Sequence, residues 1–235
     1  MPPPRCSLVI PFYQEAGNVA PVVSSACKVL QPLDAGYEAI FINDGSTDAT
    51  GRELAAAVAA LPRARVVTLP ENRGQAAALA LGLQQAQGEL IFTMDGDGQN
   101  DPADFPALLE LLERDRLDLV CGWRRDRRDP PVRRVMSRLG NAIRRRVLFD
   151  RVHDAGCQLR VFRRAVVGAL QPSPLMQSFL PAMAAAAGFR LGELPVRHHP
   201  RRHGASKYRL GNLWWRPFSE MIRLRRALRP GSLRR

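Results

Sequence analysis

The chain has 235 residues, 46% of them hydrophobic and 24% charged, which excludes collagen-like, wholly disordered and multi-span membrane proteins. Its 35 basic residues outnumber 22 acidic ones, for a net charge of +13. Residues 1–113 carry 14 acidic and 6 basic side chains, whereas residues 114–164 carry 16 basic ones and residues 196–235 carry 12. The basic second half is expected to meet something anionic: nucleic acid, a phosphorylated substrate or an anionic membrane face.

From residue 6 to residue 121, short apolar runs alternate with segments of helical spacing, which is typical of a parallel sheet with crossover helices. The predicted strands are Ser7–Ile10, Glu38–Ile42, Arg65–Leu69, Leu90–Met94 and Asp118–Cys121. The predicted helices are Val19–Leu30, Ala49–Ala60, Gln75–Ala86 and Ala103–Arg114. Suitable caps precede three of these helices: Asn18, then Thr47 or Asp48, and Asp101 followed by Pro102.

After Gly122 the alternation becomes less regular. An Arg-rich loop leads to a predicted helix ending at Phe149, a strand near Gln158–Phe162, helices around 164–187 and an apolar segment, Phe189–Val196, that returns to the sheet. No linker rich in Gly and Ser separates the halves, so one domain is expected. In the tail, apolar residues of Leu210–Leu228 fall on one helical face, and Pro217 is expected to kink or interrupt that helix.

The four cysteines show neither a Cys-x-x-Cys pair nor histidines at zinc spacing, so a reduced, cytoplasmic chain is favoured. Cys121 and Cys157 are interpreted as packing residues because no partner base is evident. The proline-rich first five residues do not read as a secretory signal, and no apolar run reaches the roughly 18 residues that a spanning helix needs.

Carboxylates follow three of the predicted strands, in the segments 11–15, 43–48 and 95–99. Ligands of open parallel sheets bind beyond the carboxyl ends of the strands, so these loops are expected to converge on one edge. Asp95 and Asp97 offer hard oxygen ligands for a divalent cation, with Gly96 allowing close approach. A simple turn or a calcium-loop fragment explains the same residues, and a strand-turn-helix cap explains the segment after Asp44.

Taken together and in order, the loops strongly resemble those of family 2 glycosyltransferases of the GT-A fold. The matching segments are Pro11-Phe-Tyr-Gln-Glu15-Ala-Gly-Asn18, Asn43-Asp-Gly-Ser-Thr-Asp48, Asn72-Arg-Gly-Gln75 and Asp95-Gly-Asp-Gly-Gln-Asn-Asp-Pro102. Later segments resemble the branch of dolichol-phosphate mannosyltransferase and its bacterial polyprenyl-phosphate relatives: Gly122-Trp-Arg124, Arg133-Arg-Val-Met-Ser137 and Arg202-His-Gly-Ala-Ser-Lys-Tyr208. The resemblance implies an α/β fold with a mostly parallel sheet flanked by helices, a donor half (1–121) and an acceptor half (122–208). The basic amphipathic tail (209–235) departs from it.

The resemblance also implies roles for particular residues. A nucleotide-sugar donor would be framed at its base and ribose by Pro11, Tyr13, Glu15 and Asp44. Asp95, Gly96 and Asp97 would meet the ribose and diphosphate, with Asp97 and Gln99 on a Mg²⁺ or Mn²⁺ ion. The donor diphosphate and the phosphate of a polyprenyl acceptor would be handled by Arg124, Arg133, Ser137, Arg202 and Lys207.

Elementary chemistry agrees with these roles. A lipid phosphate is already anionic at neutral pH and attacks without a general base, so two polyanions must be brought together by positive charge. The sequence therefore predicts a metal-dependent, inverting transfer to a polyprenyl phosphate. We expect a chain peripheral to the cytoplasmic membrane face, meeting the lipid at an anionic surface or through a separate membrane protein.

Other interpretations stay open at this point. If the acceptor is a saccharide or another hydroxyl compound, Asp154 is the candidate base; otherwise it caps a turn or binds an arginine. Trp214 and Trp215 suit either the core or a membrane boundary. His198, His199 and His203 suit a solvated loop facing phosphate better than a metal site. A nucleic-acid-binding module would account for the basic half but not for the carboxylate loops, so no nucleic-acid partner is expected.

Overall fold

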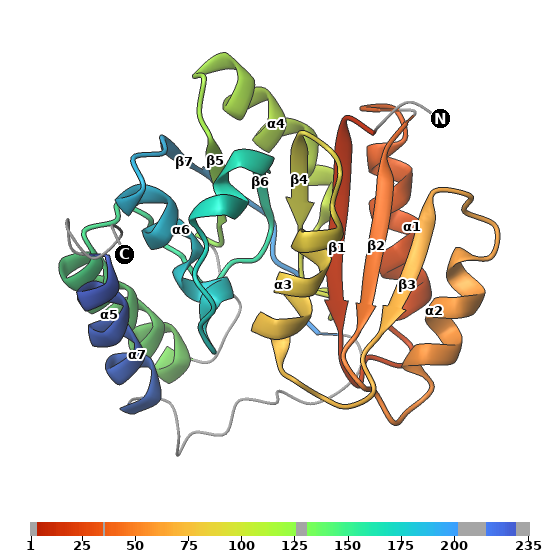
Figure 1. The fold of residues 1–235 in the computed structure, drawn as a ribbon, viewed down its shortest axis with the longest axis horizontal. Helices are drawn as coiled ribbons and strands as arrows, with labels where there is room; N and C mark the ends of the chain where they lie inside the picture. The colour runs from red at the N-terminus through yellow and green to blue at the C-terminus, as the bar shows by residue number, and fades with distance from the viewer. Residues whose placement is uncertain (1–3, 35, 126–130, 202–214, 229–235) are drawn as a thin grey trace.

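A seven-stranded sheet forms the centre of the molecule, in the order β3-β2-β1-β4-β6-β5-β7 (Figure 1). The computed structural model describes residues 4–34, 36–125, 131–201 and 215–228, giving only the backbone for residues 131–138 and 215–217. The strands are β1 (Cys6–Phe12), β2 (Glu38–Asn43), β3 (Ala64–Thr68), β4 (Leu90–Thr93), β5 (Leu119–Trp123), β6 (Arg160–Arg163) and β7 (Leu191–Pro195).

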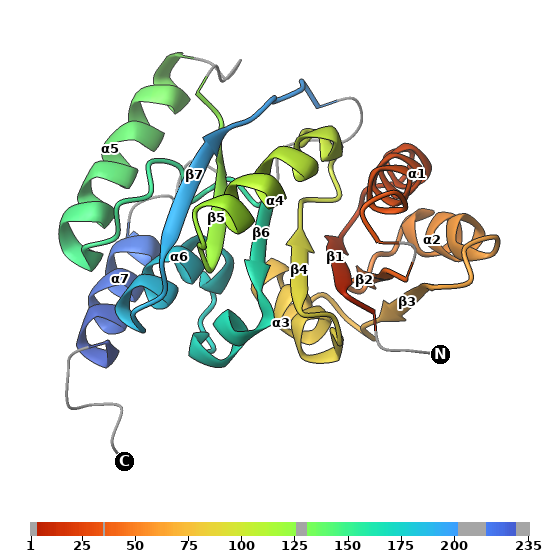
Figure 2. The ribbon, with the colours of Figure 1, turned by 90° about the horizontal axis from the view of Figure 1, so that it is seen from above.

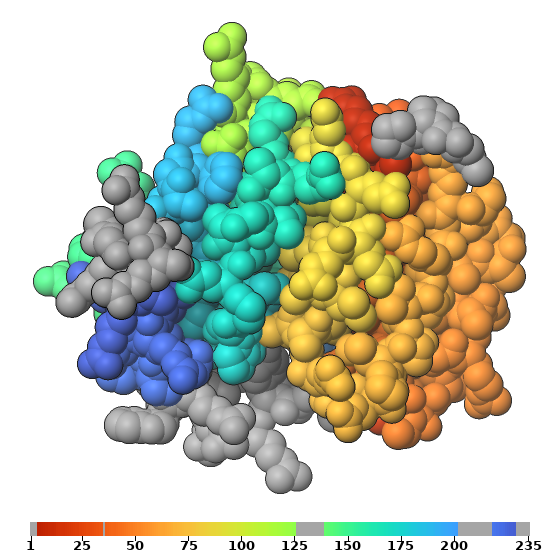
Figure 3. Space-filling model, viewed as in Figure 1, coloured from red at the N-terminus to blue at the C-terminus, as the bar shows by residue number. Residues whose placement is uncertain are grey.

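Helices cover both faces of this sheet. They are α1 (Val19–Leu30), α2 (Thr50–Val58), α3 (Gln75–Gln85), α4 (Phe105–Arg114), α5 (Pro131–Leu148), α6 (Met176–Ala186) and α7 (Trp215–Ala227), with 3-10 turns at Pro102–Asp104 and Arg164–Ala169. Seen from above, α1, α2 and α4 lie over one face, α3 and α6 lie over the other, and α5 packs beside α7 at the β7 end (Figure 2). In the space-filling view the segment around α3 (yellow) adjoins the one around α6 (blue-green) (Figure 3).

Side-chain periodicity explains the two cores. Along β1, Cys6, Leu8 and Ile10 face the core beneath α1 and α4, whereas Val9 faces the core beneath α3, as the period of two in a strand requires. Helix α4 buries Phe105, Leu108, Leu109 and Leu112, the helical spacing of a single apolar face.

The strands and helices predicted for the first half are confirmed, with ends that coincide or differ by at most two residues. β1 is parallel to β2 and β4, β2 to β3, and β5 to β7. β6 is antiparallel to both of its neighbours, so the sheet is mostly parallel. The predicted return of the segment Phe189–Val196 to the sheet is also confirmed, as β7.

One predicted cap was wrong. The Asn18 side chain does not cap α1; its amide donates to Glu15 Oε2 at 2.8 Å. The predicted helices around 164–187 are confirmed as the 3-10 turn at Arg164–Ala169 and α6. Pro217 lies in the first turn of α7, where no intrahelical partner exists for a backbone N–H, and residues 210–214 of the predicted tail helix lie outside the described residues. At α2, Asp48 rather than Thr47 accepts the N–H of Thr50, at 3.0 Å.

The carboxyl ends of β1 to β4 point to the lower edge in Figure 1. The loops that carry the predicted donor residues therefore share this edge of the sheet.

Candidate active site

The loop after β1 is tied to the loop after β2. Gln14 has a φ of 51°, in the left-handed region that non-glycine residues seldom adopt. Its backbone N–H donates to Ser46 Oγ at 3.0 Å, and its side-chain amide donates to Thr47 Oγ1 at 2.7 Å. The Glu15 N–H donates to Thr50 Oγ1 at 2.8 Å. These bonds hold the strained backbone and bring the first two carboxylate loops together, as predicted.

Asp44 is buried and joins the loop after β2 to the loop after β3. One carboxylate oxygen accepts the Arg73 N–H at 2.8 Å, and the other accepts the Asn72 side-chain amide at 2.8 Å. Gly45 has a φ of 62°, and a Cβ there would lie 2.2 Å from the Glu71 carbonyl carbon. The close approach of the two loops therefore requires glycine. The predicted contact of Asp44 with a nucleoside stays a prediction.

Asp95 stands just beyond β4, and its Oδ1 accepts the Gln75 side-chain amide at 2.5 Å. Burial, and then the negative charge of Asp97, raise the pKa of the Asp95 carboxyl to about 7. Three cations act in the opposite direction: Arg124, Arg160 and Arg201. Asp95 therefore lies close to a second carboxylate, and the positive charges of three arginines act on its carboxyl.

Gly96 allows the β4 loop to pass directly over the end of β1. A Cβ at this position would lie 2.5 Å from the Phe12 ring and 2.8 Å from the Pro11 carbonyl oxygen. A larger residue would push the two loops apart. Pro11 and the Asp95–Asp97 segment, which the resemblance assigns to the same ligand, are therefore in contact distance of each other.

Asp97 is bound by an arginine that the sequence interpretation did not select. Arg201 NH2 lies 2.6 Å from Asp97 Oδ2, and Arg201 NH1 lies 3.2 Å from Glu15 Oε1. The other Asp97 oxygen accepts the Gln99 N–H at 3.1 Å. Arg202, the residue named from sequence, lies next along the chain and outside the described residues.

The chemistry of these residues fits a Mg²⁺ or Mn²⁺ ion. A guanidinium already bridges the carboxylates of Glu15 and Asp97, so the place between them is one that accepts a cation. Among the described residues, no three His, Cys, Asp or Glu side chains group as a complete metal cage. Mg²⁺ commonly uses one or two carboxylates together with substrate phosphates and water, so Asp97 and Gln99 suit an ion shared with a diphosphate.

Arg124 and Asp154 form a buried, two-point ion pair beyond the end of β5. Arg124 Nε lies 2.7 Å from Asp154 Oδ2, and Arg124 NH2 lies 2.9 Å from Asp154 Oδ1. The side chains are only 11% and 5% exposed. Burial opposes the charge of Arg124, but Asp154 outweighs it and raises the Arg124 pKa. The arginine-binding role for Asp154 is thus confirmed.

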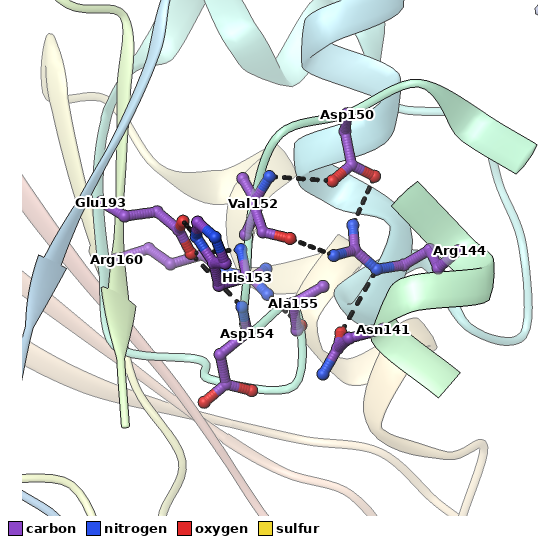
Figure 4. Close-up of polar contacts among 9 residues, drawn as sticks. All are labelled: Asn141, Arg144, Asp150, Val152, His153, Asp154, Ala155, Arg160 and Glu193. Carbon is purple, nitrogen blue, oxygen red and sulfur yellow. Dashed lines mark hydrogen bonds and ion pairs between the residues drawn. The ribbon is translucent and has the colours of Figure 1, made fainter. Parts of the chain in front are cut away.

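The loop that carries Asp154 is fixed at its start by a second buried pair (Figure 4). Arg144 of α5 donates to Asp150 Oδ2 and to the Val152 carbonyl oxygen, and Asp150 Oδ1 accepts the Val152 N–H at 3.1 Å. The side chains of Arg144 and Asp150 are 6% and 0% exposed. Removing one partner of such a pair would leave the other charge buried and uncompensated, at a large cost in stability. The pair therefore fixes the path of the loop.

Glu193 of β7 and Arg160 of β6 hold the rest of this loop. Glu193 accepts the N–H groups of His153 at 2.7 Å and Asp154 at 3.3 Å (Figure 4). The fully buried Arg160 donates to the Ala155 carbonyl oxygen at 2.7 Å. Asp154, and through it Arg124, is therefore positioned by three different elements of the fold.

The cysteines and histidines singled out in the sequence make packing or hydrogen-bonding contacts where the structure describes them. Burial raises the pKa of Cys121 to about 12 and that of Cys157 to about 11, which confirms their interpretation as packing residues. His199 contacts Asp101 at 3.2 Å rather than joining a metal cluster, and His198 forms a β-bridge with Asn100. His203 lies outside the described residues.

With the loops and their carboxylates in place, comparison with known proteins is informative. The family model described as glycosyl transferase family 2 matches residues 7–170. The chain belongs to glycosyl transferase family 2. A dodecaprenyl-phosphate galacturonate synthase of Rhizobium johnstonii is 39% identical over 213 residues, which cover 86% of this chain and 61% of that protein.

Other relatives point the same way. An undecaprenyl-phosphate 4-deoxy-4-formamido-L-arabinose transferase of Yersinia enterocolitica is 36% identical over 215 residues, covering 89% of this chain and 64% of the relative. The family 2 chain thus spans about three fifths of the length of these relatives. No helix among its described residues is long and apolar enough to cross a membrane.

Solved structures share the fold of this family 2 chain. A Pyrobaculum calidifontis mannosyltransferase, in complex with GDP-Man and Mn²⁺, aligns with a TM-score of 0.61 at 21% identity, over 82% of this chain and 55% of that one. Glucosyl-3-phosphoglycerate synthase of Mycobacterium tuberculosis, with Mn²⁺, UDP and its product, aligns with a TM-score of 0.63 at 23% identity, over 85% and 73%. The expected GT-A fold is confirmed.

The side chains of several predicted site residues lie outside the part of the chain that the structure describes. Arg133 and Ser137 belong to α5, whose backbone alone is described there, and Lys207, like Arg202, lies outside the described residues. Trp214 also lies outside them. The sequence interpretation missed four residues of the site: Arg144, Arg160, Glu193 and Arg201. Nothing in their local sequence separates them from neighbouring arginines or strand residues, since their importance comes from long-range contacts.

Proposed function

We propose that this chain transfers a sugar, with inversion, from a UDP- or GDP-sugar to a polyprenyl phosphate, using Mg²⁺ or Mn²⁺. The observation that carries the proposal is the charge separation at one sheet edge: Glu15, Asp95 and Asp97 stand on the β1 and β4 loops, and Arg124 stands on the β5 end. The acceptor class is supported by the relatives, which are a dodecaprenyl-phosphate galacturonate synthase and an undecaprenyl-phosphate 4-deoxy-4-formamido-L-arabinose transferase.

The donor side supports binding of a diphosphate with a divalent ion. Asp97 and Gln99 would hold the ion, with Asp95 close by, at the edge where Pro11 approaches Gly96. Such an ion, when bound, stabilises negative charge on the departing nucleoside diphosphate. Pro11, Tyr13, Glu15 and Asp44 remain the proposed contacts to base and ribose.

The acceptor side supports attack by a group that needs no base. Both oxygens of Asp154 accept from Arg124, so this carboxylate is engaged in an ion pair instead of facing a hydroxyl proton. A phosphate acceptor is anionic at neutral pH and requires positive charge to approach the donor. Arg124 supplies a fixed charge, and we assign Arg133, Ser137, Arg202 and Lys207 to the same task from sequence.

We propose further that the α5–α7 end of the molecule meets the cytoplasmic face of an anionic membrane. Among the described residues, the most exposed large apolar side chains are Leu139 of α5, Phe149 just after it and Phe218 of α7, at 50%, 70% and 44%. Arg225 covers the Phe149 ring at 4.4 Å. Exposed aromatic rings among arginines are suited to an interface with anionic headgroups.

A release assay tests the transfer reaction. The full chain would be incubated with Mn²⁺ or Mg²⁺ and a panel of UDP- and GDP-sugars, with and without a polyprenyl phosphate, and nucleoside diphosphate would be measured. We expect release that needs both the metal and the lipid. Release with a saccharide acceptor instead would favour the hydroxyl-acceptor activity, and no release with any donor would contradict the proposal.

A further inference from the structure

A short segment after β7 runs back along the loop that carries the proposed metal ligands. We call residues 197–201 the strap. At its start, the Arg197 N–H donates to Asp104 Oδ2 at 2.8 Å, and the Arg197 guanidinium contacts Asp104 Oδ1 at 2.7 and 2.9 Å. The same guanidinium lies 3.1 Å from Asp101. The strap is thereby anchored at the far end of the loop.

The middle of the strap pairs with the loop in antiparallel order. His198 bridges Asn100, and the His199 N–H donates to the Gln99 carbonyl oxygen at 2.9 Å. The Gln99 side-chain amide returns a bond to the His199 carbonyl oxygen at 3.3 Å. Gln99, a proposed metal ligand, is therefore held on both its backbone and its side chain by the strap.

The strap ends in Arg201, whose side chain is 24% exposed and lies between Glu15 and Asp97. Its contact with Asp97, at 2.6 Å, is a charge-assisted hydrogen bond of the shorter kind. Among the described residues, the oxygen it occupies, Oδ2, accepts no backbone N–H, whereas Oδ1 accepts from Gln99. Arg201 therefore occupies the position that a cation bound by Asp97 requires.

A guanidinium and a divalent ion cannot share that oxygen without strong repulsion between their charges. Binding of the ion alone would exchange one favourable ion pair for another, and would leave Arg201 without its carboxylates. Binding of the ion together with a diphosphate brings in the negative charge that a displaced Arg201 needs. The two ligands are thus expected to favour each other's binding, as linkage requires.

We propose that Arg201 is an internal counter-ion that blocks Asp97 until a diphosphate and a divalent ion arrive together. This inference rests on the metal site of the proposed function, and it goes beyond it by assigning a residue that suppresses metal binding in the donor-free protein. It also links the strap to the state of the site, because displacement of Arg201 releases the strap's end from Asp97 and Glu15.

Mn²⁺ titration of the full chain, with free ion followed by its electron paramagnetic resonance signal, tests this directly and needs neither sugar nor lipid. Without nucleotide, we expect Arg201→Gln to bind Mn²⁺ about tenfold more tightly than the wild type, since a charge-assisted competitor has been removed. Adding UDP or GDP should tighten Mn²⁺ binding more in the wild type than in Arg201→Gln. Asp97→Asn should abolish the binding.

The matched control is Arg5→Gln, which also removes one positive charge but pairs with Glu113, at the other end of β1. It should bind Mn²⁺ as the wild type does, within about twofold. Thermal unfolding without metal checks that each variant is folded. Equal or weaker Mn²⁺ binding by Arg201→Gln, or an equal gain in Arg5→Gln, would overturn the proposal, whereas failure of sugar transfer alone would leave the metal measurement unaffected.

Discussion

The acidic and basic halves of the chain use their charges differently. In the donor half, two carboxylates that order the loops accept hydrogen bonds from backbone N–H groups and a neutral side chain: Asp44 from Arg73 N–H and Asn72, and Asp48 from Ala16 and Thr50 N–H. In the acceptor half, Arg124 and Arg144 form buried ion pairs with carboxylates. The first half holds its edge carboxylates with neutral donors and with Arg201, whereas the second uses buried ion pairs to fix the loop beside Arg124.

Positive charge for an anionic surface must therefore come mainly from arginines outside these buried ion pairs. The guanidinium groups of Arg145, Arg146 and Arg151 line a hollow at the end of α5 and contact no carboxylate within the part of the chain that the structure describes. Asp150, in the same hollow, is already paired with Arg144. Among the described residues, the three arginines therefore carry charge that no carboxylate offsets.

Removing the carboxylate at the donor edge is expected to have the largest effect. Asp97→Ala should lower kcat/KM by about a thousandfold or more, because a metal ligand contributes several kcal/mol of transition-state stabilisation. Steady-state release of nucleoside diphosphate measures this. Asp115→Ala, an exposed carboxylate paired with Arg114, should keep full activity. Unimpaired turnover in Asp97→Ala, with an unchanged melting temperature, would contradict the metal assignment.

Breaking the Arg124–Asp154 pair should separate its contribution to stability from its contribution to activity. Asp154→Leu leaves a buried guanidinium alone and should lower the free energy of unfolding by about 3 to 5 kcal/mol. The double variant Arg124→Met/Asp154→Leu should regain most of that stability and still lack activity, since the fixed charge is gone. Denaturant unfolding and the release assay separate the two effects. Recovery of activity in the double variant would argue against Arg124 as a phosphate contact.

The three arginines at the end of α5 should matter for membrane binding. Replacing Arg145, Arg146 and Arg151 with Gln is expected to weaken binding to anionic vesicles roughly a hundredfold, since each cation near such a surface contributes about 1 kcal/mol. Vesicle sedimentation at fixed ionic strength measures the affinity, and neutral vesicles should show little binding by either protein.

A charge-matched control for that experiment lies in the donor half. Three exposed arginines of the donor half can be changed to Gln together: Arg52, Arg114 and Arg116. Their loss should leave vesicle binding nearly unchanged. Equal losses in the two triple variants would mean that net charge, rather than the α5 end, determines the affinity.

The smallest effect concerns acid stability of the donor half. Burial would raise the pKa of Glu38, but hydrogen bonds from Ser7, the Gln87 N–H and Arg65 outweigh it and hold the pKa below its ordinary 4.5. A lowered pKa in the folded state contributes stability above about pH 4.5 that is lost as the pH falls through the folded value.

Glu38→Gln should therefore be less stable than the wild type at pH 7, by about 1 kcal/mol, and should lose less stability on acidification from pH 5 to pH 3. Chemical unfolding across this range gives both quantities. Parallel stability curves for the two proteins would show that Glu38 is not responsible for the acid sensitivity.

Much of the donor half was predictable because its signals are local. Continuous apolar runs gave β1, β2 and β4, and the carboxylates after them predicted a shared edge, which Gln14, Ser46 and the Gly96–Pro11 contact confirm. The caps were less predictable: Asn18 is a good helix cap by composition, yet its side chain is used by Glu15. A nearby carboxylate that needs a donor outweighs a local preference.

The order of strands and helices along the chain, the position of the acidic loops and the excess of arginines follow from the sequence alone. Which arginine performs which task was decided only by the tertiary structure: Arg201 reaches Asp97 across 104 positions, Arg124 reaches Asp154 across 30, and β6 enters the sheet antiparallel. Periodicity and turn chemistry act over a few residues, whereas the partner of a buried charge is set by the packing of distant segments, which no local pattern records.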